Sequence, residues 1–197
     1  MSPDPTRRSE ASRQAILVAT RELCGEIGYG RLTIEGIAAR AGVGKKTIYR
    51  WWPSKAAVVT EMIDDTATRT AQHQDTGDLV ADMRTQLLAV IDLVNPSATS
   101  PVAGVIADGL LDPEFGQIMR ARLIDPRIED FKQRLRAAQD AGQLNPEADL
   151  DIALDLFYGT IYHRLVFHLG MPDAAYLDKI MGYIVAALEH GPATTHS

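Results

Sequence analysis

The side chains best suited to chemistry in this sequence are hydrogen-bond donors gathered in one short stretch. The segment KKTIYR contains two lysines, a threonine, a tyrosine and an arginine within a few positions. Side chains of these types donate hydrogen bonds to phosphate oxygens and to base edges in DNA grooves. The candidate contacts are Lys45, Lys46, Thr47, Tyr49 and Arg50. We therefore expect this stretch to bind nucleic acid.

Two helix starts near this stretch offer further positions for phosphate. Thr33 and Ser54 are residue types that cap helix N-termini, and Lys55 follows Ser54 directly. Backbone N–H groups at a helix N-terminus are free to bind an anion. Phosphates of a bound duplex could therefore lie beside Thr33 and Lys55.

The elements that must position these residues are two short helices joined by a tight turn. Apolar spacing predicts a helix over residues 33–40, a turn over 41–44 and a second helix over 45–51. Gly42 supplies the positive φ that the turn needs. Ile37 and Ile48 would bury their side chains against a long preceding helix. The pattern is a helix-turn-helix, although helical hairpins with a purely structural role share it.

The amino-acid sequence around the predicted helix-turn-helix strongly resembles that of one protein family. Residues 28–59 read GYGRLTIEGIAARAGVGKKTIYRWWPSKAAVV and are similar to the DNA-binding domain of the TetR/AcrR family of bacterial transcriptional regulators. The matching elements are Gly28-Tyr29, Thr33-Ile34, Ile37-Ala38, Ala41-Gly42-Val43, Thr47-Ile48-Tyr49 and Ser54-Lys55. The resemblance implies a DNA-binding domain over residues 9–69, with the motif at about 32–51.

The resemblance also assigns roles to individual residues. It implies DNA contacts by Thr33, Gly44, Lys45, Lys46, Thr47, Tyr49, Arg50, Trp51 and Lys55. Trp52 takes a core position that is usually phenylalanine. The segment departs from the family pattern in two ways: Lys46 stands where glycine is common, and the Trp51-Trp52 pair is bulkier than usual. Base preference therefore cannot be transferred from other members.

Charge is distributed unevenly along the chain. The 197 residues carry a formal net charge of −6, which by itself argues against nucleic-acid binding. Residues 1–60, however, contain ten lysines and arginines against five acids, so they carry +5 and the remainder carries −11. This division suggests two parts with different partners.

The rest of the chain is predicted to be helical as well, giving an all-α fold with about nine or ten helices. Helical spacing of apolar residues covers residues 9–27, 80–94, 102–111, 147–169 and the stretch that starts near Pro172-Asp173. Asp112-Pro113 and Asp125-Pro126 both read as helix starts, so that region holds two helices or one kinked helix. Residues 72–78 form a boundary, 95–101 a loop and 191–197 a disordered tail.

Residues 77–190 are expected to form a sensor and dimer module. The helix over residues 147–169 is apolar on two sides, which requires burial on two sides. In the family that the sequence resembles, the last two helices pair with their copies. The expected interface residues are Leu150, Leu154, Ile161, Leu165, Ile180, Tyr183 and Ile184. A single buried core helix without dimerisation is the alternative.

The same module is expected to hold a cavity for a small apolar or aromatic effector. Methionines and aromatic residues suit an adaptable cavity, although ordinary core packing uses the same types. The candidate lining residues are Met83, Leu87, Ile91, Ile106, Leu110, Phe115, Met119, Phe157, Tyr158, Tyr162 and His163.

Other function classes find little support. No apolar run approaches the ~20 residues of a membrane span, no signal peptide is evident, and the one cysteine, Cys24, suits a reducing cytoplasm. His163 and His168 lie off one helical face, so no metal is expected, nor any cofactor. An α-helical enzyme remains the alternative, without a catalytic motif to support it. The sequence thus predicts a cytoplasmic, homodimeric repressor that binds a pseudo-palindromic operator and is released by an effector.

Overall fold

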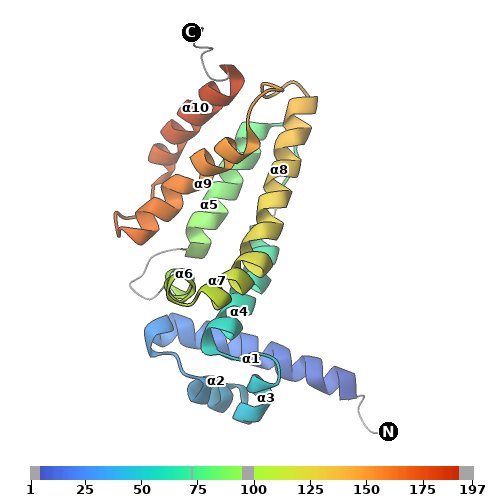
Figure 1. Ribbon diagram of the computed structural model, residues 1–197, viewed down its shortest axis with the longest axis vertical. Helices are drawn as coiled ribbons and strands as arrows, with labels where there is room; N and C mark the ends of the chain where they lie inside the picture. The colour runs from blue at the N-terminus through green and yellow to red at the C-terminus, as the bar shows by residue number, and fades with distance from the viewer. Residues whose placement is uncertain (1–4, 72, 95–99, 191–197) are drawn as a thin grey trace. The chain divides into compact units, whose positions relative to one another are not determined.

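The computed structural model describes residues 5–71, 73–94 and 100–190, and most of these residues are helical (Figure 1). They contain ten α-helices, one 3₁₀ turn, one π-helical turn and no strand. The predicted all-α fold is confirmed. The chain forms two compact units, the first made of Met1–Thr66 with Pro96–Leu123 and the second of Ala67–Asn95 with Ile124–Ser197.

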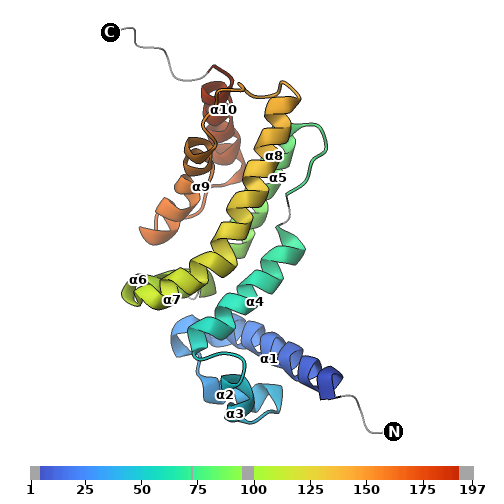
Figure 2. The same ribbon diagram turned by 45° about the vertical axis from the view of Figure 1, so that its right-hand side comes forward.

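Unit 1 contains the predicted helix-turn-helix. Its elements are α1 (Pro5–Ile27), the 3₁₀ turn η1 (Tyr29–Arg31), α2 (Ile34–Ala41), α3 (Lys45–Tyr49), most of α4 (Lys55–Thr70), α6 (Pro101–Leu111) and α7 (Pro113–Met119). Figures 1 and 2 both show α2 and α3 beside the long α1. The hydroxyl of Thr33 accepts a hydrogen bond from the N–H of Gly36 at 3.0 Å. Gly42 ends α2 with φ 66°, as the turn requires.

The two short helices are held by their buried faces. Ile37 of α2 and Ile48 of α3 are both fully buried, at 0% exposure, and Trp52 follows at 2%. A helix as short as α3 is unstable alone in water, because the nucleation cost exceeds the gain from so few hydrogen bonds. Its position is therefore set by the apolar residues on which Ile48 and Trp52 pack.

Unit 1 also includes α6 and α7, which the sequence assigned to the 77–190 module. The ring of Tyr29 lies against Gly104 of α6 so closely that no side chain would fit at that glycine. The Tyr29 hydroxyl donates a hydrogen bond to the Asp108 carboxylate. The Asp112 carboxylate accepts hydrogen bonds from Glu114 N and Phe115 N, both at 3.1 Å, and so caps α7 as Asp112-Pro113 predicted.

Unit 2 is a bundle of α5 (Leu79–Val94), α8 (Asp125–Asp140), α9 (Leu150–Val166) and α10 (Ala174–His190). Helix α9 contacts the other three, as Figure 2 shows. Phe131 of α8 lies in the middle of the core, with its ring centroid 5.4 Å from that of Phe157 and 5.2 Å from that of Tyr158. Both pairs are edge-to-face, the geometry that aromatic quadrupoles favour.

One predicted helix start differs from the structure. Helix α9 begins at Leu150 rather than at 147, because the Asp149 carboxylate accepts hydrogen bonds from Asp151 N and Ile152 N and forms the cap. At Asp125-Pro126, where two helices or one kinked helix were predicted, α8 follows the preceding turn without a break. Helical structure continues from α7 through the π turn η2 (Arg120–Ile124) into α8, with no side-chain cap between them. The predicted loop residues 95–99 and tail 191–197 lie outside the described residues.

A buried ion pair links α5 to α8. Arg134 and Asp82 lie 2.7 Å apart, with only 4% and 2% of their side chains exposed. The hydroxyl of Thr76 donates to Asp82 at 2.6 Å. Although burial raises the pKa of Asp82, the hydrogen bonds from Thr76 and Arg134 outweigh it and leave that pKa below its usual value. The carboxylate is thus held in its charged form.

Because the folded chain binds a proton at Asp82 more weakly than the unfolded chain, this pair stabilises unit 2 fully above about pH 4–5. The stabilisation is lost as the pH falls further. We expect Asp82→Asn to lower the free energy of unfolding by about 3 kcal/mol at neutral pH, since Arg134 loses its buried counter-charge. Denaturant unfolding monitored across pH measures both. An unchanged acid dependence in the variant would contradict the assignment.

Candidate nucleic-acid interface

Helix α3 presents one buried face and one exposed face. Ile48 is buried, whereas Lys45, Lys46, Tyr49 and Arg50 are exposed and Thr47 is half-buried. Trp51, just past the helix, is also exposed. The structure therefore brings the predicted DNA contacts of the second motif helix to the solvent side of α3, where a duplex could reach them.

The cations of this face differ in their partners. The Nζ of Lys45 lies 2.9 Å from Glu35 Oε1, and this pairing raises the pKa of Lys45 and lowers that of Glu35. The guanidinium of Arg50 lies over the Trp51 ring, 5.5 Å from its centroid. The side chain of Lys46 forms neither an ion pair nor a hydrogen bond with any residue that the structure describes. Lys46 is therefore the cation most available for a phosphate or a base.

The two predicted phosphate positions are occupied differently. Thr33 is exposed at the start of α2, and its hydroxyl already caps that helix. Lys55 is half-buried at the start of α4: its Nζ donates to the Tyr29 carbonyl at 3.1 Å and lies 4.2 Å from the centroid of that ring. Lys55 must give up or share these contacts to bind a phosphate, so this role remains a prediction.

Several cations counted in the basic N-terminal part are neutralised within unit 1. Arg40 pairs with Glu26 at 2.7 Å and with Glu22 at 3.2 Å, and Arg21 pairs with Asp65 at 3.1 Å. The charge of +5 from the sequence therefore overstates the positive field of this surface. The cations left for DNA are concentrated on α3 instead of being spread over the unit.

One residue that shapes this interface had no signal in the motif. Glu61 of α4 is 7% exposed and accepts a hydrogen bond from the indole Nε1 of Trp52 at 2.8 Å. A buried tryptophan requires such an acceptor for its N–H. That requirement predicts a partner but does not say which residue supplies it, because the choice depends on how α4 crosses the turn after α3.

Cys24 of α1 is buried in the core of unit 1. Burial raises the pKa of its thiol to about 11, which leaves very little reactive thiolate at neutral pH. In the described residues no cluster of three histidine, cysteine or acidic side chains could hold a metal ion. No helix in the described part of the chain is long and apolar enough to cross a membrane.

The predicted effector-pocket residues fall into both units. In unit 2, Met83, Leu87, Ile91 and Phe157 are buried, Tyr158 and Tyr162 are half-buried, and His163 is exposed. The other four belong to unit 1, where Leu110 is 76% exposed and Ile106, Phe115 and Met119 are partly exposed. Only the unit 2 residues share one core, so these carry the proposal below.

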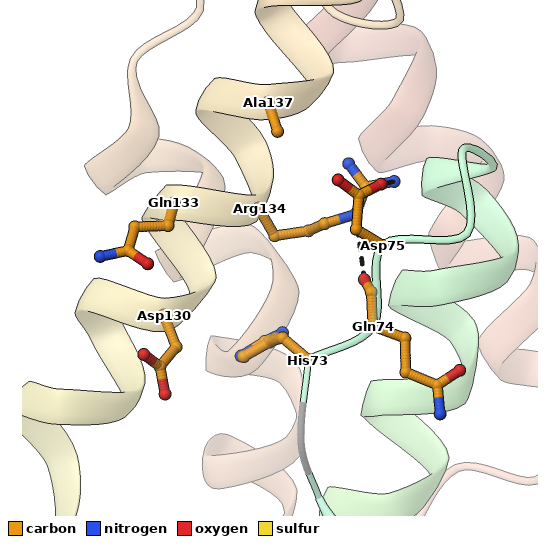
Figure 3. A pocket seen from close by; sticks show the side chains of 7 residues that line it. All are labelled: His73, Gln74, Asp75, Asp130, Gln133, Arg134 and Ala137. Carbon is orange, nitrogen blue, oxygen red and sulfur yellow. Dashed lines mark hydrogen bonds and ion pairs between the residues drawn. The ribbon is translucent and has the colours of Figure 1, made fainter.

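A pocket of about 450 Å³ in unit 2 has a different lining. His73, Gln74 and Asp75 of the linker face Asp130, Gln133, Arg134 and Ala137 of α8 (Figure 3). None of the predicted pocket residues lines it. Its wall includes the guanidinium of Arg134, which also pairs with Asp82. At least one residue of this pocket therefore stabilises the fold of unit 2.

Three of the seven predicted interface residues are turned inward. Ile161, Leu165 and Ile184 are buried in the core of unit 2, at 1–4% exposure, and Leu150, Leu154 and Ile180 are partly exposed. Tyr183 is 81% exposed. The second stripe of α9 faces outward, with Ile152 at 57%, Leu156 at 39% and Val166 at 51%. Part of the predicted interface stripe thus lies in the core of unit 2, and the interface itself remains a prediction.

Comparison with known proteins agrees with this geometry. A family model described as "Tetracyclin repressor-like, C-terminal domain" matches residues 73–184, and one described as "Bacterial regulatory proteins, tetR family" matches residues 16–62. The chain belongs to the TetR family. Members are DNA-binding transcriptional regulators and not enzymes, so this TetR-family chain is a DNA-binding transcriptional regulator, as the resemblance implied.

Several relatives support the family assignment. The chain is 34% identical over 159 residues to the uncharacterized HTH-type transcriptional regulator YdeS of Bacillus subtilis, covering 81% of this chain and 80% of that protein. It is 27% identical over 187 residues to the DNA-binding transcriptional repressor TetR of Mycobacteroides abscessus, covering 92% and 95%. The crystal structure of the TetR family regulator SCO0332 matches with TM-score 0.77 and 29% identity, covering 90% and 98%.

Lys46 provides a direct test of the α3 surface in this TetR-family protein. We expect Lys46→Ala to weaken binding to the preferred duplex roughly tenfold and to relax preference at one base pair, since it removes an unpaired cation from the exposed face. Titration of the preferred duplex and its single-base variants measures both effects. Lys179→Ala on α10 serves as the control. If Lys46→Ala leaves both duplex affinity and base preference unchanged, the predicted DNA contact by Lys46 is wrong.

Proposed function

We propose that this TetR-family regulator is a homodimeric repressor that binds a pseudo-palindromic operator and releases it when a small molecule enters unit 2. The observation that carries the proposal is an outward apolar stripe on α9 and α10, which a monomer would leave in water. A single recognition helix makes few base contacts, whereas a two-fold dimer reads two half-sites.

The outward apolar residues lie on two helices that contact each other. Ile152, Leu156 and Val166 follow one another along α9, and Tyr183 extends from α10. The two helices contact each other within unit 2. Scattered apolar residues on a surface need no explanation, but a run along adjacent helices marks a binding surface. We infer that α9 and α10 pair with their copies in a four-helix arrangement.

The core of unit 2 contains features that favour a ligand with an apolar body and a hydrogen-bond donor. Met83, Leu87 and Phe157 are buried there. Gln86, next to them on α5, uses its Nε2 to donate to the Ala71 carbonyl at 3.1 Å, while its buried Oε1 accepts no hydrogen bond from the described residues. An unsatisfied buried acceptor costs about 1–3 kcal/mol, which a donor on the ligand would recover.

The repressor assignment rests on a relative. The Mycobacteroides abscessus protein that aligns over 92% of this chain is named a DNA-binding transcriptional repressor. A repressor of this design has two states, of which only one spaces its recognition helices for successive major grooves. An effector that binds the other state more tightly shifts the population and releases the operator.

The dimer is tested by placing charge on the stripe. The double variant Leu156→Glu/Tyr183→Glu should be monomeric at micromolar concentration and should bind operator at least tenfold more weakly, because buried unpaired carboxylates oppose association. Analytical ultracentrifugation and duplex titration measure the two effects. Val80→Glu, on an exposed position of α5, is the control. A double variant that remains dimeric would overturn the proposed interface.

Effector release is tested at Gln86. A compound that displaces the wild-type protein from its operator should also raise the midpoint of thermal unfolding. Gln86→Leu should bind DNA as the wild type does but need roughly tenfold more compound, since the acceptor is gone. Displacement titrations with both proteins measure this. An identical compound requirement would remove Gln86 from the effector site.

A further inference from the structure

Glu61 joins three separate segments of unit 1 at one buried carboxylate. It accepts the indole N–H of Trp52 at 2.8 Å, and it pairs with Arg13 of α1 and with Arg122 of the π turn η2, the latter at 2.6 Å. Only 10% of the Glu61 side chain is exposed. This one carboxylate therefore contacts α1, the turn after α3 and η2 at the same time.

The link from Glu61 to the recognition helix runs through Trp52. The backbone N–H groups of Trp51 and Trp52 both donate to the carbonyl of Ile48, at 2.9 and 3.0 Å, and so close the end of α3. Trp52 is 2% exposed and its ring orientation is fixed by the bond to Glu61. The exposed residues Tyr49 and Arg50 lie on this closing turn. Their position therefore follows the position of the Trp52 ring.

The two arginines that pair with Glu61 come from different parts of unit 1. Arg13 lies on α1, within the DNA-binding motif's own three-helix core. Arg122 belongs to a segment far along the chain and lies in a π turn, a rare form that often occurs at functional sites. A change of hydrogen-bond register in that turn would move the Arg122 guanidinium away from Glu61. The buried Glu61 carboxylate would then keep Arg13 as a counter-charge and lose Arg122.

We propose that Glu61 is a positioning residue for DNA binding, and that Arg122 makes the position of the recognition helix depend on the segment after α7. The positioning role of Glu61 requires only that the protein binds DNA. A part for the Arg122–Glu61 pair in effector release rests on the proposed function. Arg122 itself does not touch DNA in this proposal. Its side chain acts on α3 only through Glu61 and Trp52.

A double-mutant cycle between these residues tests the proposal in the full-length protein. The variants are Glu61→Gln, Arg122→Gln and their combination, and glutamine keeps an acceptor for the Trp52 indole. The matched set is Glu129→Gln, Arg136→Gln and their combination. That pair lies in unit 2 at 2.8 Å, and Arg136 is 50% exposed against 48% for Arg122. The probe is a duplex that the wild-type protein selects from a random pool.

We expect Glu61→Gln to weaken duplex binding roughly tenfold and Arg122→Gln roughly fivefold, with the combination no weaker than Glu61→Gln alone. The dependence of affinity on salt should keep its slope in Arg122→Gln, because no phosphate contact is lost. Fluorescence of the two tryptophans, both on this turn, should shift in both single variants. The matched set should change neither affinity nor fluorescence.

Three results would overturn the proposal. Additive losses in the combined variant would show that Arg122 acts independently of Glu61. A salt slope reduced by about 0.9 in Arg122→Gln would make Arg122 a direct phosphate contact. Unchanged affinity in Arg122→Gln would remove it from DNA binding altogether. Selection of a duplex by the wild-type protein separates these outcomes from failure of the proposed function, and the midpoint of thermal unfolding shows that each variant is folded.

Discussion

The burial of Ile48 and Trp52 is the interaction on which the DNA-binding surface depends. Helix α3 is too short to persist alone, so its exposed residues are ordered only because its inner face is fixed to the core of unit 1. Everything that touches that core can therefore influence how α3 meets DNA. The Trp52 indole makes this dependence specific, because it ties the end of α3 to one carboxylate rather than to a general apolar contact.

Charge in this protein is organised by pairing more than by composition. The net charge of −6 is the sum of a basic N-terminal part and an acidic remainder. Within the basic part, several cations are already paired with acids, such as Arg40 with Glu26. The cations that remain exposed on α3 are few and lie on one face. We expect such a surface to bind DNA where geometry permits and the acidic remainder of the chain to oppose non-specific association.

Local features of the fold were predictable from the sequence because their causes are local. Thr33, Gly42 and Asp112 act through their own backbone and the next turn, and each lies where its residue type predicts. The start of α9 was predicted at residue 147 and lies at Leu150, because apolar spacing does not locate the cap that Asp149 supplies. The two apolar stripes of α9 posed the same problem. Composition cannot tell which stripe faces α5 and α8 and which is left for a partner.

Long-range partners were beyond prediction for a different reason. Glu61 lies in the predicted DNA-binding domain, but one of its arginines comes from a segment that the sequence assigned to another module. Nothing in the spacing of residues encodes that meeting, which depends on α6 and α7 packing in unit 1. The effector candidates divided between the units for the same reason, because helical periodicity identifies buried faces without saying which core they enter.

The central claim, that this TetR-family regulator reads DNA as a two-fold dimer through α3, is tested most directly by selecting bound duplexes from a random pool. The account predicts two inverted half-sites whose centres lie about one helical turn apart, roughly 10 base pairs, or a multiple of it. It also predicts that a duplex with one half-site scrambled binds far more weakly. Enrichment of a single unrepeated site, or no enrichment at low salt, would contradict it.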